Sequence, residues 1–142
     1  LTELPVSSVV RGIARHALDL FTALVEAKPS PLGGGTVGAH PKVAAAIEQA
    51  REAIDQGAAT LHALAEDVWH TATRDSPLDD TIIRRCTSEC ARVVARLVTS
   101  IGSLAPLAGM NALHRADPFS AAWQDLTAAA AHYSVSPLLI AD

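Results

Sequence analysis

The sequence predicts an all-α protein, an antiparallel up-down four-helix bundle, and three observations support this class. Aromatic residues make up only 4% of the 142 residues, and β-branched residues rarely alternate with polar ones as a half-buried strand requires. Alanine and leucine dominate, and both favour helix. Long stretches repeat apolar residues at spacings of three and four, the pattern of a helix with one buried face. Long helices joined by fairly short loops are typical of an antiparallel bundle.

Four helices are expected, each bounded by residues that interrupt the apolar pattern. We predict them over residues 7–28, 41–74, 78–105 and 119–133. Pro29-Ser30-Pro31 ends the first helix, and Pro41 suits the first turn of the second. Gly57 weakens the second helix by about 1 kcal/mol relative to alanine, and Asp75-Ser76-Pro77 ends it. A looser stretch, PLAGMNALHRADP, precedes the fourth helix.

Composition limits the classes of partner. Residues 1–142 form one domain, and a hydrophobic fraction of 49% argues against disorder. A net charge of −4 argues against nucleic acid as a partner. No uninterrupted apolar run reaches the roughly 20 residues that cross a bilayer, so no membrane partner is expected. LTELPVSS lacks the features of a signal peptide, and two cysteines fit a reducing, cytoplasmic setting.

Three patterns that could carry chemistry are better explained by structure. Cys86 and Cys90 share a helix face, but two thiols are too few for a structural zinc site, and packing in the core is favoured. PLGGGTVG follows a helix and lacks the Lys-Ser/Thr of a phosphate-binding loop, which favours a plain linker. His62, Glu66 and His70 span about 12 Å of one helix, too far for one ion. We therefore predict no metal site.

The stretch WQDLTAAAAHYSVSP, residues 123–137, leaves two interpretations open. On a helix, one face would carry Asp125, Ala128, Ala129 and His132. The alanines would let a ligand come close, and His132 stands beside several polar groups at a helix end. An ordinary helix end, with serine hydroxyls capping nearby backbone groups, explains the same residues. Spacing alone favours the structural interpretation over a ligand site.

Three short motifs occur in a fixed order along the chain. They are GIARHALD at residues 12–19, AGMNAL at residues 108–113 and DLTAAAAH at residues 125–132. They resemble G-I-A-R-x-A-L-D, A-G-G-x-A-L/I and R-D-L-x-A-A-x-x-H of the C-terminal helical domain of the acyl-CoA dehydrogenase superfamily. The similarity is greatest to the branch of flavin-dependent monooxygenases that act on aromatic or other small substrates. Each motif alone is weakly specific, but their order and spacing cover nearly the whole chain.

This resemblance implies a larger protein. A full subunit of the family has an N-terminal helical domain and a middle β-domain, which are absent from this chain, before the C-terminal bundle. It usually forms a tetramer, so we expect a homo-oligomer, and the isolated chain is expected to be inactive. The flavin, FAD or FMN, lies between the β-domain and the bundle. A separate flavin reductase could supply it in reduced form.

The resemblance also implies roles for single residues. His132 matches the histidine that lies near the flavin ring and the substrate, so we expect it to be catalytic. It would hydrogen-bond a reactive flavin–oxygen adduct or take a proton from a phenolic substrate. Gly109 and Asn111 match a segment that passes close to the flavin phosphate or ribose. Together with Asp125 they are expected to bind the cofactor.

Tyr133 and Ser134 follow the histidine directly and are expected to bind the substrate. Two departures qualify the resemblance, because Ala121 and Gln124 stand where the family often has arginine. A non-catalytic, degenerate bundle that assembles with a flavin-bearing partner is therefore the alternative. An acyl-CoA dehydrogenase domain is a second alternative, but no glutamate follows Glu89 to act as its base. This absence favours monooxygenase chemistry.

Overall fold

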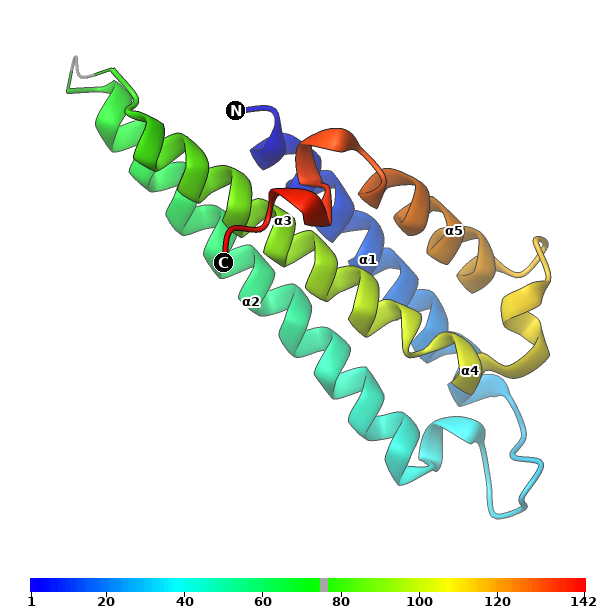
Figure 1. Ribbon diagram of the computed structural model, residues 1–142. Coiled ribbons are helices and arrows are strands. Elements are labelled where there is room, and N and C mark those ends of the chain that lie inside the picture. The colour runs from blue at the N-terminus through cyan, green and yellow to red at the C-terminus, as the bar shows by residue number, and fades with distance from the viewer. Residues whose placement is uncertain (75–76) are drawn as a thin grey trace.

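The computed structural model describes residues 1–74 and 77–142 and shows a bundle of four long helices (Figure 1). These helices are α1 (Glu3–Ala27), α2 (Pro41–Ala72), α3 (Asp80–Gly102) and α5 (Pro118–Ala130), and α4 (Ala105–Ala108) is a single turn. The predicted all-α bundle is confirmed. The predicted break at Asp75-Ser76-Pro77 falls largely on residues 75–76, which lie outside the described residues.

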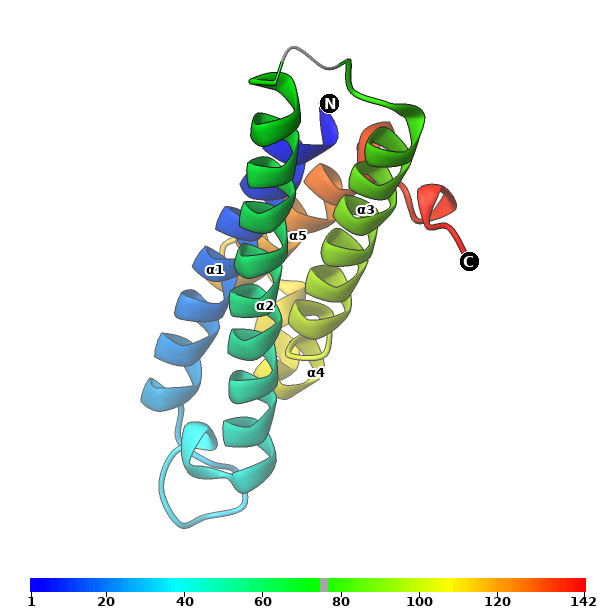
Figure 2. The same ribbon diagram turned by 90° about the vertical axis from the view of Figure 1, so that its left-hand side faces the viewer.

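Helix α1 is the central helix of the bundle. It contacts α2, α3 and α5, and α2 also packs along α3. Figure 2 shows α1, α2 and α3 running side by side, with α5 behind them. The buried stripe of α1 explains this position, because it is wide enough that several neighbouring helices are needed to cover it. The stripe consists of Val10, Ala14, Ala17, Leu18, Phe21 and Val25.

Several predicted boundaries are wrong by a few residues. Helix α1 begins at Glu3, not at residue 7, because Pro5 lies in its first turn, where the missing N–H would have no partner in any case. The predicted third helix ends at Gly102, and the stretch expected to be loose forms α4 and a 3-10 turn over Gly109–Leu113. Helix α5 ends at Ala130, three residues before the predicted end.

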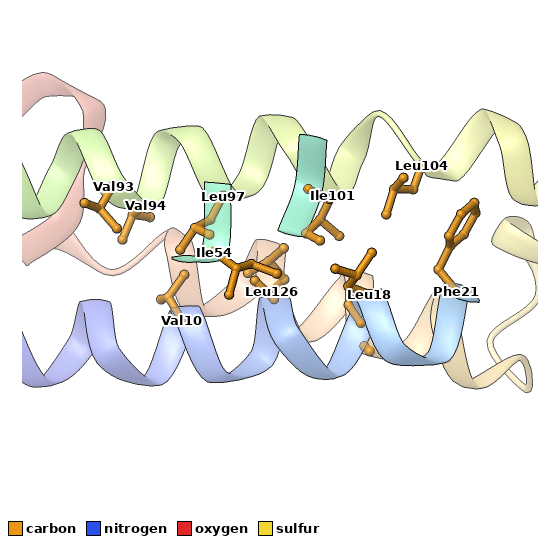
Figure 3. Close-up of a cluster of buried hydrophobic side chains, with 14 of the residues drawn as sticks. Val10, Leu18, Phe21, Ile54, Val93, Val94, Leu97, Ile101, Leu104 and Leu126 are labelled. Atoms are coloured by element: carbon orange, nitrogen blue, oxygen red, sulfur yellow. The ribbon is translucent and has the colours of Figure 1, made fainter. Parts of the chain in front are cut away.

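The core fills the space between α1, α3 and α5, with α2 covering one side (Figure 3). Leu97 of α3 and Leu126 of α5 are fully buried there. Toward the end of the bundle, the rings of Phe21 and Phe119 meet edge to face with centroids 5.3 Å apart. These contacts fix the position of α5 against α1.

Gly57 has a role in packing α2 against α3 that its low helix propensity does not indicate. A Cβ at this position would lie 3.1 Å from Cγ1 of Val93, closer than ordinary van der Waals contact. The glycine therefore lets α2 approach α3 closely, at the cost of a weaker helix.

The C-terminal residues cross the outside of α3 (Figure 1). The Ala141 N–H donates to the Ser88 hydroxyl at 2.9 Å, and the Arg92 guanidinium donates to the Ala141 carbonyl. The tail after α5 is thereby tied to the middle of α3.

The segment Asp80–Leu113, which includes α3, is long and apolar enough to cross a membrane by length and composition alone. The apolar side of α3 is buried against α1 and α2, as in the core helix of any bundle. Composition therefore gives only weak support for a membrane span here.

Cys86 and Cys90 are buried thiols at one end of the core, as predicted. Burial raises the pKa of Cys86 to about 12, and the neighbouring Cys90 thiol adds to this shift. Burial also raises the pKa of Cys90. Both groups are therefore neutral in the folded chain at ordinary pH, and a neutral thiol is a poor nucleophile.

We predict that these thiols make the folded chain less stable in alkali. In the unfolded chain Cys86 loses its proton near pH 9, whereas in the folded chain it keeps it until about pH 12. The free energy of unfolding should thus fall between these values, by up to about 1.4 kcal/mol per pH unit for Cys86. Urea unfolding from pH 8 to 11 should show a shallower decline for Cys86→Ala than for the wild type. Parallel declines would contradict the prediction.

Candidate functional site

The chain changes direction where α5 ends. Ala130 is the last residue of α5, and His132 has an extended backbone, with φ −61° and ψ 134°. The next three residues form a 3-10 turn, Tyr133–Val135. His132 consequently does not share a helix face with Asp125, because the helical spacing stops before it.

The His132 side chain is held by the turn that follows it. Its Nδ1 lies 2.8 Å from the Ser134 hydroxyl and accepts the Ser134 backbone N–H at 3.3 Å. Its ring stacks on that of Tyr133, with centroids 4.7 Å apart and planes inclined by 30°. Ser134 is buried, whereas the His132 and Tyr133 side chains are exposed. The structure thus brings together three of the residues that the sequence predicted.

His132 lines a shallow groove between the start of α1 and the end of α5. The groove has a volume of about 290 Å³ and is lined by Pro5, Val6, Val9, Val10, Ala129 and His132. His132 supplies the single polar side chain in this lining. An apolar floor with one hydrogen-bonding group at its edge suits a flat, largely apolar ligand. We name it the His132 groove.

Asp125 lies apart from this groove. It is exposed on α5, and so is Ala128 one turn later. Asp125 lies about 8 Å along the helix axis before the end of α5 at Ala130, and His132 follows beyond that end. Of the predicted face, Ala129 and His132 reach the groove, whereas Asp125 and Ala128 do not.

Gly109 and Asn111 lie beside the C-terminal end of α1. The Lys28 ammonium group donates to the Ala108 carbonyl at 2.8 Å and to Oδ1 of Asn111 at 3.0 Å. Gly109 has φ +69°, and a Cβ there would lie 3.2 Å from Nζ of Lys28. Sequence analysis missed Lys28, because its partners lie 80 and 83 residues away.

The two regions are at opposite ends of α5. Ser120 near the start of α5 donates its hydroxyl to the Ala112 carbonyl at 2.9 Å, which ties the Gly109–Leu113 turn to that end. The 13 residues of α5 measure about 20 Å. A single planar ring cannot contact both His132 and Gly109 over that distance.

A second groove adjoins Gly109 and carries positive charge. It has a volume of about 340 Å³, and Lys28, His40 and Lys42 are among its lining residues. Ser30 adds a hydroxyl. This end of the bundle can therefore attract an anionic part of a ligand, such as a phosphate.

His62, Glu66 and His70 lie on the exposed side of α2. His62 Nε2 lies 3.4 Å from Glu66 Oε1, and both side chains are exposed. Within residues 1–74 and 77–142, no group of three His, Cys, Asp or Glu side chains is placed to hold a metal ion.

The chain is similar to a known protein family and to several solved structures. A family model described as "Acyl-CoA dehydrogenase, C-terminal domain" matches residues 4–137. No match was found among curated proteins. Among the solved structures that share the fold are three whose alignments each cover 96% of this chain.

The first of these is XiaF from Streptomyces sp. in complex with FADH2 and glycerol, with a TM-score of 0.85 and 17% identity. The second is the 3-HSA hydroxylase from Rhodococcus sp. RHA1, with a TM-score of 0.79 and 20% identity. The third is the HsaA monooxygenase from M. tuberculosis, with a TM-score of 0.77 and 20% identity. The match covers 35%, 34% and 35% of those chains, so this chain spans about a third of their length. At such identities the likeness establishes the fold.

We predict that Gly109→Ala destabilises the chain by about 1–3 kcal/mol, because its backbone conformation is open essentially to glycine alone. Gly12→Ala is the matched control, since Gly12 lies on the exposed side of α1 with nothing within 4 Å of an added Cβ. That change should stabilise the chain by up to about 1 kcal/mol. Urea unfolding measures both, and equal effects of the two substitutions would show the prediction to be wrong.

Proposed function

The chain belongs to the family of acyl-CoA dehydrogenase C-terminal domains, and we propose that it is this domain of a flavin-dependent monooxygenase. In the proposed enzyme the bundle forms one wall of the flavin and substrate site and part of the oligomer interface. The substrate is an aromatic or other small molecule. The observation that carries the proposal is the His132 groove, which joins an apolar floor to one exposed imidazole.

The residues of the chain fit a flavin in two places. The His132 groove suits the edge of a planar ring system, since five of its six lining residues are apolar. The groove with Lys28 and Lys42 suits a phosphate group, and Gly109 adjoins it. Asn111 fits less well as a direct ligand, because its Oδ1 already accepts from Lys28. We infer that Asn111 acts by holding Lys28.

The valines and the histidine of the His132 groove, together with Tyr133, then have distinct physical tasks. Reduced flavin, when bound, would supply the electrons that activate oxygen. The valines of α1 would exclude water from the face of an aromatic substrate, which strengthens polar interactions beside it. His132 would present a hydrogen-bonding group to the substrate or the cofactor. Tyr133, stacked on His132, would restrict the orientation of the imidazole ring.

We further propose that the chain is part of a larger, oligomeric protein. Similarity to proteins about three times as long supports a larger subunit with further domains. Met110, Leu113 and Leu138 are exposed apolar side chains that further domains or subunits could cover. We propose a homo-oligomer, a separate flavin reductase and a cytoplasmic location.

The alternative is a non-catalytic bundle that serves assembly with a flavin-bearing partner. Its support is specific, because α5 carries no lysine or arginine. Ala121 is exposed where the family often has arginine, and Gln124 bonds to Ser120 on its own helix. The sequence of the gene discriminates between the monooxygenase and the non-catalytic bundle. A β-domain encoded upstream in the same reading frame favours the enzyme. An acyl-CoA dehydrogenase domain is the second alternative and would show acyl-CoA oxidation.

We predict that His132→Ala in the intact gene product lowers turnover by about 100-fold or more, because a positioned acid–base or hydrogen-bonding group is lost. The measurement is oxygen uptake dependent on reduced flavin, with a panel of phenols as substrates. Flavin content and melting temperature should change little, because the His132 side chain is exposed.

His114→Ala is the matched control, because His114 is exposed near the other end of α5. Its turnover should equal that of the wild type. Unchanged turnover of His132→Ala with flavin bound would remove His132 from the mechanism.

A further inference from the structure

We propose that Ser134 fixes His132 as a hydrogen-bond donor through Nε2, and that the site therefore selects an aromatic ligand whose oxygen accepts a hydrogen bond. Such an oxygen belongs to a phenol, a phenolate or a ring carbonyl. Ser134 is then a positioning residue, not a contact to the substrate. The ligand part of this inference rests on the proposed function, whereas the part about the imidazole stands on the contacts within the chain.

The Ser134 backbone N–H decides which nitrogen of His132 carries the proton. An amide N–H can only donate, and it points at Nδ1 from 3.3 Å. A hydrogen on Nδ1 would point at the hydrogen of the amide and repel it. Nδ1 must therefore present its lone pair, and in the neutral ring the proton resides on Nε2.

The Ser134 hydroxyl strengthens the same arrangement. Its oxygen lies 2.8 Å from Nδ1, and a hydroxyl can turn its hydrogen toward a lone pair. Ser134 is only 7% exposed, so water competes little for this contact. The hydroxyl is thereby engaged by the imidazole and is not free to bind a substrate.

A second histidine shows what the hydroxyl adds. Nδ1 of His40 accepts the backbone N–H of Lys42 at 3.2 Å, in the same relation of two residues along the chain. Residue 42 carries no hydroxyl, so His40 has the backbone donor alone. The serine at position 134 supplies His132 with a second donor to the same atom.

This arrangement has a direct chemical consequence. His132 lines the groove, and its hydrogen bonds to other described residues all involve Nδ1, so Nε2 has no acceptor among them. A neutral ring with its proton on Nε2 can donate there but cannot take a proton there. Of the two roles open to His132, donation to an oxygen of the ligand is favoured over abstraction of a phenolic proton.

The direct test is ¹⁵N–¹H long-range correlation spectroscopy of the six histidines in the 142-residue chain. The His132→Gln variant identifies the His132 signals. At a pH where the ring is neutral we expect Nδ1 unprotonated and Nε2 protonated. A dominant Nδ1–H form, or equal populations of the two forms, would overturn the inference.

Matched variants assign the effect to the hydroxyl. Ser134→Ala should raise the population of the Nδ1–H form, and Ser134→Thr should restore the wild-type pattern. Ser136→Ala is the control, because the Ser136 hydroxyl accepts from Leu138 and does not contact His132. A Ser134→Ala spectrum identical to that of the wild type would show that the hydroxyl has no positioning role.

The ligand part is tested in the intact gene product with a substituted phenol as the probe. Ser134→Ala should raise KM by up to about tenfold, the size of one neutral hydrogen bond, and Ser134→Thr should restore it. An unchanged KM would overturn the claim of selectivity. A wild type without flavin-dependent oxygen uptake would instead refute the proposed function and leave the spectroscopic result standing.

Discussion

The packing of α1 against three neighbouring helices is the constraint on which both candidate regions depend. Its first turns provide Val6 and Val9 to the His132 groove, and its last residues lead into Lys28, which holds the turn that contains Gly109. One rigid helix thereby sets the spacing between a region suited to a planar ring and a region suited to an anion. Burial of the apolar residues of α1 maintains this spacing, and the contacts of Glu3 with Thr87 and of Lys28 with Asn111 add polar bonds at the two ends.

The end of α5 shows why structural and functional interpretations of one stretch need not compete. Ser134 donates its backbone N–H to Nδ1 of His132, and this contact caps the 3-10 turn that follows the helix. In the neutral ring the same contact favours Nε2 as the donor, on a side chain that lines the groove. A residue that caps a turn through its side chain is held more firmly than one on a free surface, which suits a group that must be preorganised for a ligand.

Sequence analysis predicted what depends on local pattern and missed what depends on contacts distant in the chain. Apolar stripes located the four long helices, since burial of one face is periodic in sequence. The predicted end of α5 was too late, because a run of alanines carries helix propensity up to His132, whereas the helix ends at Ala130 and the His132 side chain caps the next turn. Lys28 has partners 80 and 83 residues away, and Gly57 is explained by Val93 on another helix. Neither relation leaves a periodic signal.

The most direct measurement is a crystal structure of the intact gene product with reduced flavin and an aromatic ligand bound. The account predicts Nε2 of His132 within about 3 Å of an acceptor oxygen on that ligand or on the cofactor. It also predicts that the apolar residues of the His132 groove contact the ring. A structure in which the flavin lies elsewhere, with Nε2 of His132 facing bulk water, would contradict it.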